Sequence, residues 1–278
     1  MVDRPATVRP TRAEIDLDAI AANVATLRAH AGTDRFCAVV KADGYGHGAV
    51  PAARAALEGG ADWLAVALVE EAAVLREAHV DAPILLLSEP PTHAARRVVD
   101  LDVRPTLYTA AGIDAFVAHP GHPVHLKVNT GMNRVGADPA DVAGLARRAV
   151  EGGLRLEGVW THCAVADDPD DPFTAEQVAR FDSAVADLAA QGIEPEMVHV
   201  ANSAGAIAHP ATRRDMVRVG IALYGVAPSA ALADAVPLRP ALRLRSAVSF
   251  VKEVPAGERI SYGLVHRFGH PTVVATVP

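Results

Sequence analysis

The amino-acid sequence predicts an α/β protein: a (β/α)8 barrel of the TIM type, followed by the start of a mainly β second domain. Eight short apolar segments typical of buried strands recur over about 190 residues, and segments with helical periodicity lie between most of them. After about residue 227 the composition becomes proline-punctuated, and the later segments alternate with no helix between them. We therefore expect a barrel domain at 11–232 and a β domain at 233–278. The expected barrel strands are 36–40, 63–67, 84–87, 103–107, 124–128, 156–160, 197–201 and 216–223.

The first ten residues are expected to be extended, and Glu14 to Leu17 then alternate as an edge strand would. Asp18 can then cap a helix that ends at Gly32. The apolar residues of this helix share one face, which consists of Ile20, Val24, Leu27 and Ala31.

The clearest helix is expected at 174–191. Thr174 and Gln177 fit a capping box at its start, and Gly192 supplies a stop. Its apolar residues form one stripe, which consists of Val178, Phe181, Val185 and Leu188.

A doubly wound parallel sheet is the alternative fold for alternating strands and helices. That fold usually carries G-x-G-x-x-G after its first strand, and Gly44, Gly46 and Gly48 do not have this spacing. The sequence also has no GxxxxGK[ST] loop. The barrel is therefore favoured.

Composition and charge exclude several classes of protein. With 278 residues, of which 50% are apolar and 4% aromatic, the chain can build a large and mainly aliphatic core. A net charge of −7 argues against a nucleic-acid or membrane-surface partner. No stretch is as long as a membrane span, and the first ten residues lack the apolar centre of a signal peptide. Cys37 and Cys163 have no metal-ligand spacing, which predicts reduced core thiols in a cytoplasmic enzyme without a metal site.

The segment Phe36–Gly48 carries the main chemical signal. An apolar strand leads directly into Lys41, and the three glycines that follow permit a tight turn and close approach of the backbone to a ligand. An amine held partly out of water is more often the nucleophilic free base, so Lys41 is a candidate for Schiff-base formation with an aldehyde. The apolar run alone slightly favours the alternative, a lysine that ends a strand and reaches into solvent.

Polar residues that follow the strands of a barrel share one mouth. Phosphate sites often follow strands 7 and 8, where Ser203 offers a hydroxyl and Gly220 and Ile221 offer backbone N–H groups. Taken alone, Ser203 would be a helix N-cap, which is common, and Arg218 a surface ion pair, but their conjunction with Lys41 disfavours both alternatives. The residues expected at the mouth are Lys41, Tyr45, 129–134, His162, Asn202, Ser203, Arg218, Gly220 and Ile221.

Six segments, in order, resemble the successive blocks of the alanine racemases, which are pyridoxal-phosphate enzymes built on a barrel. The resemblance extends from about residue 11 to 268, and chance agreement would not keep both order and spacing. The segments are KADGYGHG (41–48), LKVNTGMNRVG (126–136), GVWTHCAVAD (158–167), VANSAGA (200–206), RVGIALYG (218–225) and ISYG (260–263).

The resemblance implies an isomerase that binds pyridoxal 5'-phosphate and interconverts L- and D-alanine with two bases. Lys41 would carry the cofactor and act on one face of the substrate Cα, and Tyr262 of a second subunit would act on the opposite face. Racemisation removes a proton from one side and returns it on the other, which two differently placed groups can do. The resemblance also implies a cytoplasmic homodimer whose product supplies cell-wall peptidoglycan.

Further roles are implied residue by residue. Arg218 would face the pyridine nitrogen, where a permanent cation discourages protonation and weakens the electron sink. Arg134 would lie near the cofactor hydroxyl and the substrate carboxylate. Lys127 aligns with a lysine that many members carry as a carbamate, and a lysine paired with a carboxylate is the equally weighted alternative. The other implied cofactor contacts are Tyr45, His162, Asn202, Ser203, Gly220 and Ile221.

The sequence departs from the family pattern in two places. Asn129 stands where the family often has aspartate, so the charge around Arg134 differs. The family's chain continues past Pro278, so we expect the C-terminal β domain to be incomplete in this sequence and part of the substrate pocket to lie outside it.

Two other clusters of polar residues are interpreted as structure without function. His119, His122 and His125 are spaced like metal ligands, but they lie in a Pro/Gly segment without a carboxylate cluster, which predicts a solvated loop. The acidic run from Asp167 to Asp171 is broken by proline and is expected to be an exposed loop.

Two alternative functions share the strand that ends in a lysine. A non-catalytic pyridoxal-phosphate carrier needs neither Tyr262 nor the segment from 240 onward. A barrel amino-acid decarboxylase would need an acidic partner for the pyridine nitrogen, and Arg218 has the opposite charge.

Overall fold

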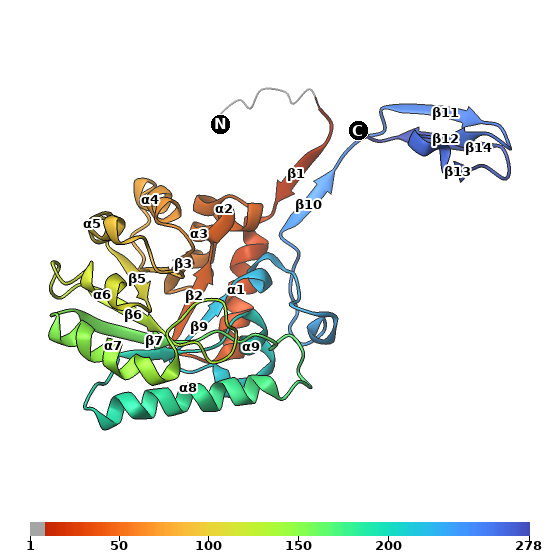
Figure 1. Cartoon of the computed structure of the whole chain (residues 1–278). Coiled ribbons are helices and arrows are strands. Elements are labelled where there is room, and N and C mark those ends of the chain that lie inside the picture. Colours follow the sequence, from red (N-terminus) through yellow and green to blue (C-terminus); the bar gives the residue numbers. More distant parts are fainter. Residues whose placement is uncertain (1–8) are drawn as a thin grey trace. The chain divides into compact units, whose positions relative to one another are not determined.

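The computed structural model describes residues 9–278, which form two compact units. The extended conformation expected for residues 1–8 therefore lies outside the described residues. The larger unit is Asp16–Ala241, and the other combines the described residues up to Ile15 with Leu242–Pro278. Figure 1 shows the larger unit as a ring of strands with helices around it.

Eight parallel strands form one sheet in the order β8-β7-β6-β5-β4-β3-β2-β9. Between β8 and β9 the backbone bonds are sparse: Arg218 donates to Ala201 O (3.1 Å) and Asp215 donates to Val198 O (3.2 Å). The sheet is therefore a nearly closed barrel, which confirms the predicted fold class. Its strands are β2 (Arg35–Val39), β3 (Trp63–Val66), β4 (Ile84–Leu86), β5 (Val103–Leu107), β6 (Pro123–Lys127), β7 (Arg155–Trp160), β8 (Met197–His199) and β9 (Met216–Val219).

Helical segments connect the strands. Short 3₁₀ turns lie at Thr92–Ala94, Pro210–Thr212, Ile221–Tyr224 and Ala230–Leu232. The helical segments are α1 (Leu17–Ala31), α2 (Lys41–Gly46), α3 (Ala49–Glu58), α4 (Val69–Glu77), α5 (Ala95–Asp100), α6 (Ala110–Asp114), α7 (Pro139–Glu151), α8 (Phe173–Ala190) and α9 (Ser203–Ala208).

The core of this unit has two parts because alternate strand residues face opposite sides of the sheet. On β2, Phe36 and Ala38 pack with the helices, whereas Cys37 and Val39 pack in the barrel interior. Both cysteines are free and buried, as expected for core thiols. The interior cluster consists of Cys37, Val39, Trp63, Ala65, Leu85, Met197 and Met216.

The N-terminal strand and the first helix begin slightly earlier than predicted. The strand is β1 (Arg12–Ile15), which pairs antiparallel with β10 (Leu242–Arg245), so its contacts place it with the C-terminal segment and not with the barrel. The cap of α1 is Asp16, whose carboxylate accepts from Ala19 N (2.9 Å), and the prediction of Asp18 was wrong. Gly32 ends the helix with a φ of 63°, as predicted.

The start of α8 also differs from the prediction. The residue at its N-cap position is Pro172, and no capping box forms. Gln177 is instead buried: its amide accepts from Ala164 N (2.8 Å) and donates to His162 O (3.1 Å). A tertiary contact therefore takes the side chain that the local pattern assigned to the helix end.

The interpretation of three histidines as a solvated loop was wrong for two of them. His122 is buried and its Nε2 bonds Val103 O (3.0 Å), and His125 on β6 is completely buried in the barrel interior. The strand starts at Pro123, so the proline marks a strand entry and not a loop.

The second unit is made of strand pairs. β11 (Phe250–Val254) pairs antiparallel with β14 (Thr272–Thr276), and β12 (Arg259–Ile260) pairs with β13 (His266–Arg267). Within the described part of the chain, no helix combines the length and the apolar composition needed to cross a bilayer.

Candidate active site

The chain leaves β2 through an unusual turn that positions Lys41. Residues 42–45 all have φ between 52° and 61°, so they form a turn of left-handed helix. This conformation costs about 1–2 kcal/mol for each residue that carries a Cβ, and Ala42, Asp43 and Tyr45 do. Strain of this size persists only where the surroundings hold it, and it is typical of functional sites.

Glu71 on α4 holds the start of this turn. Its Oε1 accepts from Ala42 N (2.6 Å), and its Oε2 accepts from Ala67 N (2.8 Å) and Leu68 N (3.1 Å). One carboxylate therefore ties together the carboxyl ends of β2 and β3.

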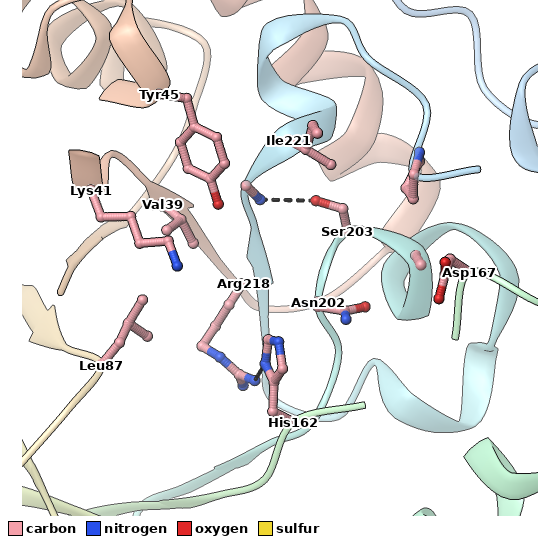
Figure 2. A pocket seen from close by; sticks show the side chains of 13 residues that line it. Val39, Lys41, Tyr45, Leu87, His162, Asp167, Asn202, Ser203, Arg218 and Ile221 are labelled. Atoms are coloured by element: carbon pink, nitrogen blue, oxygen red, sulfur yellow. Dashed lines mark hydrogen bonds between the residues drawn. The ribbon is translucent and has the colours of Figure 1, made fainter. Parts of the chain in front are cut away.

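A cavity of about 250 Å³ lies at the carboxyl ends of the strands. Figure 2 shows Lys41 and Tyr45 directed into it from one side and Ser203 and Asn202 from another. Its lining includes all the residues predicted to contact the cofactor. The lining residues used below are Lys41, Tyr45, His162, Asn202, Ser203, Arg218, Gly220 and Ile221.

Arg218 is buried at 2% exposure, so the surface ion pair considered for it was wrong. The guanidinium lies 4.4 Å from the centre of the Trp160 ring. Its Nη1 donates to His199 Nδ1 (2.6 Å), and its Nη2 donates to Thr161 O (2.7 Å), Val200 O (3.1 Å) and His162 Nδ1 (3.3 Å). Burial lowers the pKa of Arg218 to about 10, which leaves it a cation at neutral pH.

The Nε of Arg218 is buried and has no hydrogen-bond partner among residues 9–278. A buried cationic N–H without an acceptor is costly, so it is a natural point for a ligand acceptor.

Ser203 and Gly220 form the opposite part of the cavity. The cap of α9 is Asn202, whose Oδ1 accepts from Gly205 N (2.9 Å), so the N-cap alternative for Ser203 was wrong. The Ser203 hydroxyl accepts instead from Gly220 N (2.9 Å). A Cβ at Gly220 would lie 2.6 Å from Tyr45 Oη, so a larger residue there would require the tyrosine hydroxyl to move.

A second cavity, of about 330 Å³, shares Lys41 and His162 with the first and adds Lys127 and Arg134. Lys127 is 4% exposed and its Nζ lies 4.4 Å from the Trp160 ring centre. Burial and the charges of Arg218, Arg134 and Lys41 lower the pKa of Lys127 to about 7. Burial, followed by the charges of Arg218, Lys127, Arg134 and Lys41, also holds the pKa of His162 well below its ordinary value.

These two cavities suit an anionic ligand that carries a phosphate and a carbonyl carbon. The lining offers an amine nucleophile at Lys41 and hydroxyl and backbone donors near Ser203, and Arg218 supplies an unpartnered buried N–H. Permanent cations outnumber carboxylates around the cavities, which favours a ligand of negative charge.

Tyr262 lies in the other compact unit and is fully exposed. It begins a 3₁₀ turn, Tyr262–Leu264, and the residue before it, Ser261, has a φ of 62°. Its predicted role therefore remains a prediction.

Sequence reasoning missed three residues that shape this site. Trp160 lies beneath Lys127 and Arg218, His199 accepts from Arg218, and Glu71 holds the turn after Lys41. Trp160 and His199 stood within or beside segments of the resemblance, but only the barrel closure brings them to one another. Glu71 had no signal in the sequence, because acidic residues in the first turn of a helix are common.

A family model described as the N-terminal domain of alanine racemase matches residues 15–228. The chain belongs to the alanine racemase family. An alanine racemase of Symbiobacterium thermophilum is 44% identical over 278 residues, covering 98% of this chain and 74% of that protein. An alanine racemase of Thermobifida fusca is also 44% identical and covers 96% of this chain and 73% of its own length.

Solved structures of the family agree. The alanine racemase of the D-cycloserine producer Streptomyces lavendulae has a TM-score of 0.90 at 38% identity, covering 97% of this chain and 73% of that one. A histidine racemase of Leuconostoc mesenteroides has a TM-score of 0.86 at 26% identity, covering 99% of this chain and 76% of that one. The family is thus a family of isomerases, and the two solved structures are named for different amino acids, alanine and histidine.

Proposed function

We propose that this chain binds pyridoxal 5'-phosphate and interconverts L- and D-alanine. The observation that carries the proposal is one cavity bounded by a lysine amine after β2 and an arginine with an unpartnered buried N–H on β9. When bound, the cofactor supplies an electron sink for negative charge at the substrate Cα.

Lys41 and Arg218 would hold the two ends of the cofactor ring. Lys41 Nζ would bond the aldehyde carbon, and Arg218 Nε would donate to the ring nitrogen. A cation at this position keeps that nitrogen unprotonated and makes the electron sink weaker than an acidic partner would. This charge supports racemisation over decarboxylation.

The phosphate would bind near Ser203, Gly220 and Ile221, with Tyr45 and Asn202 beside it. The Ser203 hydroxyl accepts from the Gly220 N–H in this structure. With the cofactor bound, both groups would donate to phosphate oxygens. His162 would contact the ring and Arg218. The neutral form of His162, favoured by its lowered pKa, avoids a further charge beside the guanidinium.

Racemisation would use two groups on opposite faces of the substrate. Once the substrate amine has replaced it at the aldehyde carbon, the freed Lys41 Nζ would take or return the Cα proton on one face, and the partner subunit's Tyr262 would do so on the other. The complete exposure of Tyr262 supports a role outside its own chain, so we propose a homodimer with shared active sites.

Arg134 and Lys127 would bind the substrate end of the cavity. Arg134 would pair with the substrate carboxylate. With a pKa of about 7, the Lys127 amine is often the free base, so it would add to carbon dioxide and release one proton to give a carbamate anion between the cations. No carboxylate of residues 9–278 is among the charges that shift its pKa, which does not favour the paired-lysine alternative. A mass gain of one carbon dioxide in bicarbonate buffer, absent in Lys127→Met, tests this.

The remaining proposals concern the cell. We place the enzyme in the cytoplasm, where its D-alanine would supply cell-wall peptidoglycan. No nucleic acid, membrane or metal partner is proposed.

The deciding experiment measures deuterium incorporation at Cα of alanine in D2O together with the visible absorbance of bound cofactor. The chain should show both, Lys41→Ala should lose both, and Lys252→Ala, which changes an exposed lysine of the second unit, should keep both. After borohydride reduction, the cofactor mass should lie on the peptide that contains Lys41.

The same experiment separates the alternatives. Absorbance without exchange would indicate a carrier, and release of carbon dioxide would indicate a decarboxylase. Because a histidine racemase shares this fold, serine and histidine are assayed beside alanine. A colourless chain after addition of the cofactor would overturn the proposal.

A further inference from the structure

A chain of hydrogen bonds crosses the barrel interior from Arg218 to the opposite end of the strands. Arg218 Nη1 bonds His199 Nδ1 (2.6 Å), His199 Nε2 bonds His125 Nδ1 (2.9 Å), and His125 Nε2 bonds Glu157 Oε2 (3.1 Å). His125 and His199 are completely buried, and Glu157 is 5% exposed. The series of hydrogen bonds from Arg218 to Glu157 is therefore direct and contains no bridging water.

Elementary chemistry settles which atom holds each proton. A guanidinium only donates, so His199 Nδ1 accepts and its proton is on Nε2. His125 Nδ1 must then accept from His199, which puts the His125 proton on Nε2, where it is donated to the Glu157 carboxylate. Both rings must also be neutral, because a second proton on either would place two N–H groups against each other.

The far end of the chain is anchored by two arginines. Arg155 Nη2 donates to Glu157 Oε1 (2.9 Å), and Arg104 Nε lies 3.6 Å from Oε2. Burial by itself would raise the pKa of Glu157, but the hydrogen bond from His125 and the charges of the two arginines lower it, so it stays an acceptor. Burial first, then the charge of Arg218, holds the pKa of His199 well below its ordinary value.

The surroundings are shaped for this arrangement. A Cβ at Gly158, which pairs with His125 across β6 and β7, would lie 2.3 Å from the His125 Nδ1 that accepts from His199. The Trp160 ring stacks on His199 at 5.6 Å, and Trp63 meets the edge of His125 at 5.7 Å. Each ring is thus fixed in place as well as in protonation.

We propose that Glu157 is a positioning residue for Arg218 and acts through the fixed tautomers of His125 and His199. The carboxylate orients both imidazoles so that Arg218 Nη1 meets an acceptor. With Nη2 held by two carbonyls and His162, the guanidinium is then locked with Nε as its unpartnered N–H. The consequence for catalysis rests on the proposed function, whereas the tautomers belong to this chain alone.

Glu157→Gln tests the proposal because it exchanges one acceptor for a donor. Arg155 would retain the amide oxygen at the Oε1 position, and the amide NH2 at the Oε2 position would face His125 Nε2 and Arg104 Nε. The His125 proton would then move to Nδ1, the His199 proton would move to its own Nδ1, and that N–H would oppose Arg218 Nη1. Glu196→Gln is the matched control, because Glu196 bonds the same Arg155 (2.6 Å) and lies outside the chain of bonds.

The measurement is the ¹⁵N and ¹³C NMR signature of histidine tautomers in the full chain without added cofactor, with signals assigned by His125→Gln and His199→Gln. In the unaltered chain and in Glu196→Gln, both rings should be neutral with the proton on Nε2. In Glu157→Gln, both should shift toward Nδ1–H. A charged ring or an Nδ1–H ring in the unaltered chain would overturn the proposal, even if Glu157→Gln does not fold.

An unchanged tautomer pair in a folded Glu157→Gln variant would overturn it as well. In the racemisation assay, Glu157→Gln should lose about tenfold or more in rate, the scale of one lost hydrogen bond to a charged group, while Glu196→Gln keeps its rate. Equal rates for the two variants would count against the positioning role. Correct tautomers in a chain that never racemises alanine would sink the proposed function and leave the positioning of Arg218 standing.

Discussion

At the scale of the residue, Lys127 combines burial with three neighbouring cations, and each of these disfavours its charged form. Its pKa falls from 10.5 to about 7 on folding. Between these values the unfolded chain binds more protons than the folded chain, so stability increases with pH across this window.

Lys127→Met should therefore stabilise the chain most at pH values below 7. The advantage should shrink as the pH rises from 7 through 10.5, because only above 10.5 is the wild-type lysine mostly neutral in both states. Urea unfolding at a series of pH values, in bicarbonate-free buffer and without cofactor, measures the difference. Lys252→Met, at an exposed lysine, should show no such trend, and a pH-independent advantage for Lys127→Met would contradict the assigned electrostatic cause.

Ala42 carries a second conflict at the residue scale, because its φ of 52° suits glycine better than alanine. Ala42→Gly should raise the free energy of unfolding by about 0.5–1 kcal/mol, since the left-handed penalty exceeds the entropy that glycine adds to the unfolded state. Thermal melting measures the change.

The same substitution inside a regular helix provides the control. Ala25→Gly, at an exposed position of α1, should lower stability by about 1 kcal/mol. A lower melting temperature for both variants would show that the turn at 42–45 is not strained.

At the scale of the element, the carboxyl ends of β2 and β3 depend on a residue from α4. Glu71 accepts three backbone N–H groups there, from Ala42, Ala67 and Leu68, which follow the two strands. A neighbouring helix therefore supports the Lys41 turn in addition to the bonds that the turn makes within itself.

Glu71→Gln should cost about 1–3 kcal/mol of stability, because one amide NH2 would face backbone donors. Urea unfolding of the full chain measures this loss. Glu70→Gln, one residue earlier and exposed, should change stability little. Similar losses in both variants would mean that charge in the first turn of α4, and not the three bonds, matters.

At the scale of the whole molecule, the two compact units differ in how much they bury. Among the described residues of the smaller unit, the buried apolar side chains are Val254 and Phe268, whereas the larger unit has a continuous core. Several large apolar side chains of the smaller unit are more than half exposed. These include Leu244, Val248, Phe250, Val251, Val265 and Val273.

Hydrogen exchange should therefore be faster at the amides of β11 and β14 than at those of β2, because local opening there exposes little additional apolar surface. Exchange followed by mass spectrometry at low protein concentration measures both regions. Protection of β11 and β14 that increases with protein concentration would support the proposed dimer. Equal protection of the two regions at every concentration would contradict the difference in burial.

The sequence by itself determined the order of elements, because buried parallel strands require unbroken apolar runs and helices require a 3.6-residue period. All eight predicted barrel strands are present, with shifts at their ends, and the cavity brings together residues that follow β2, β7, β8 and β9. Strand ends were predictable because a parallel barrel gathers them at one mouth whatever their separation in the chain.

Only the tertiary structure decided which hydrogen-bond partners the buried polar side chains would have. His125 resembled a loop histidine until barrel closure placed it between His199 and Glu157, and Gln177 left its expected helix cap for contacts across the fold. Buried polar groups are stable only with partners, and the partners here come from strands and helices distant in the sequence. Local sequence patterns do not record such contacts. The sequence therefore indicated which residues lie at the barrel mouth, whereas the folded barrel decided the protonation of its buried histidines and the orientation of Arg218.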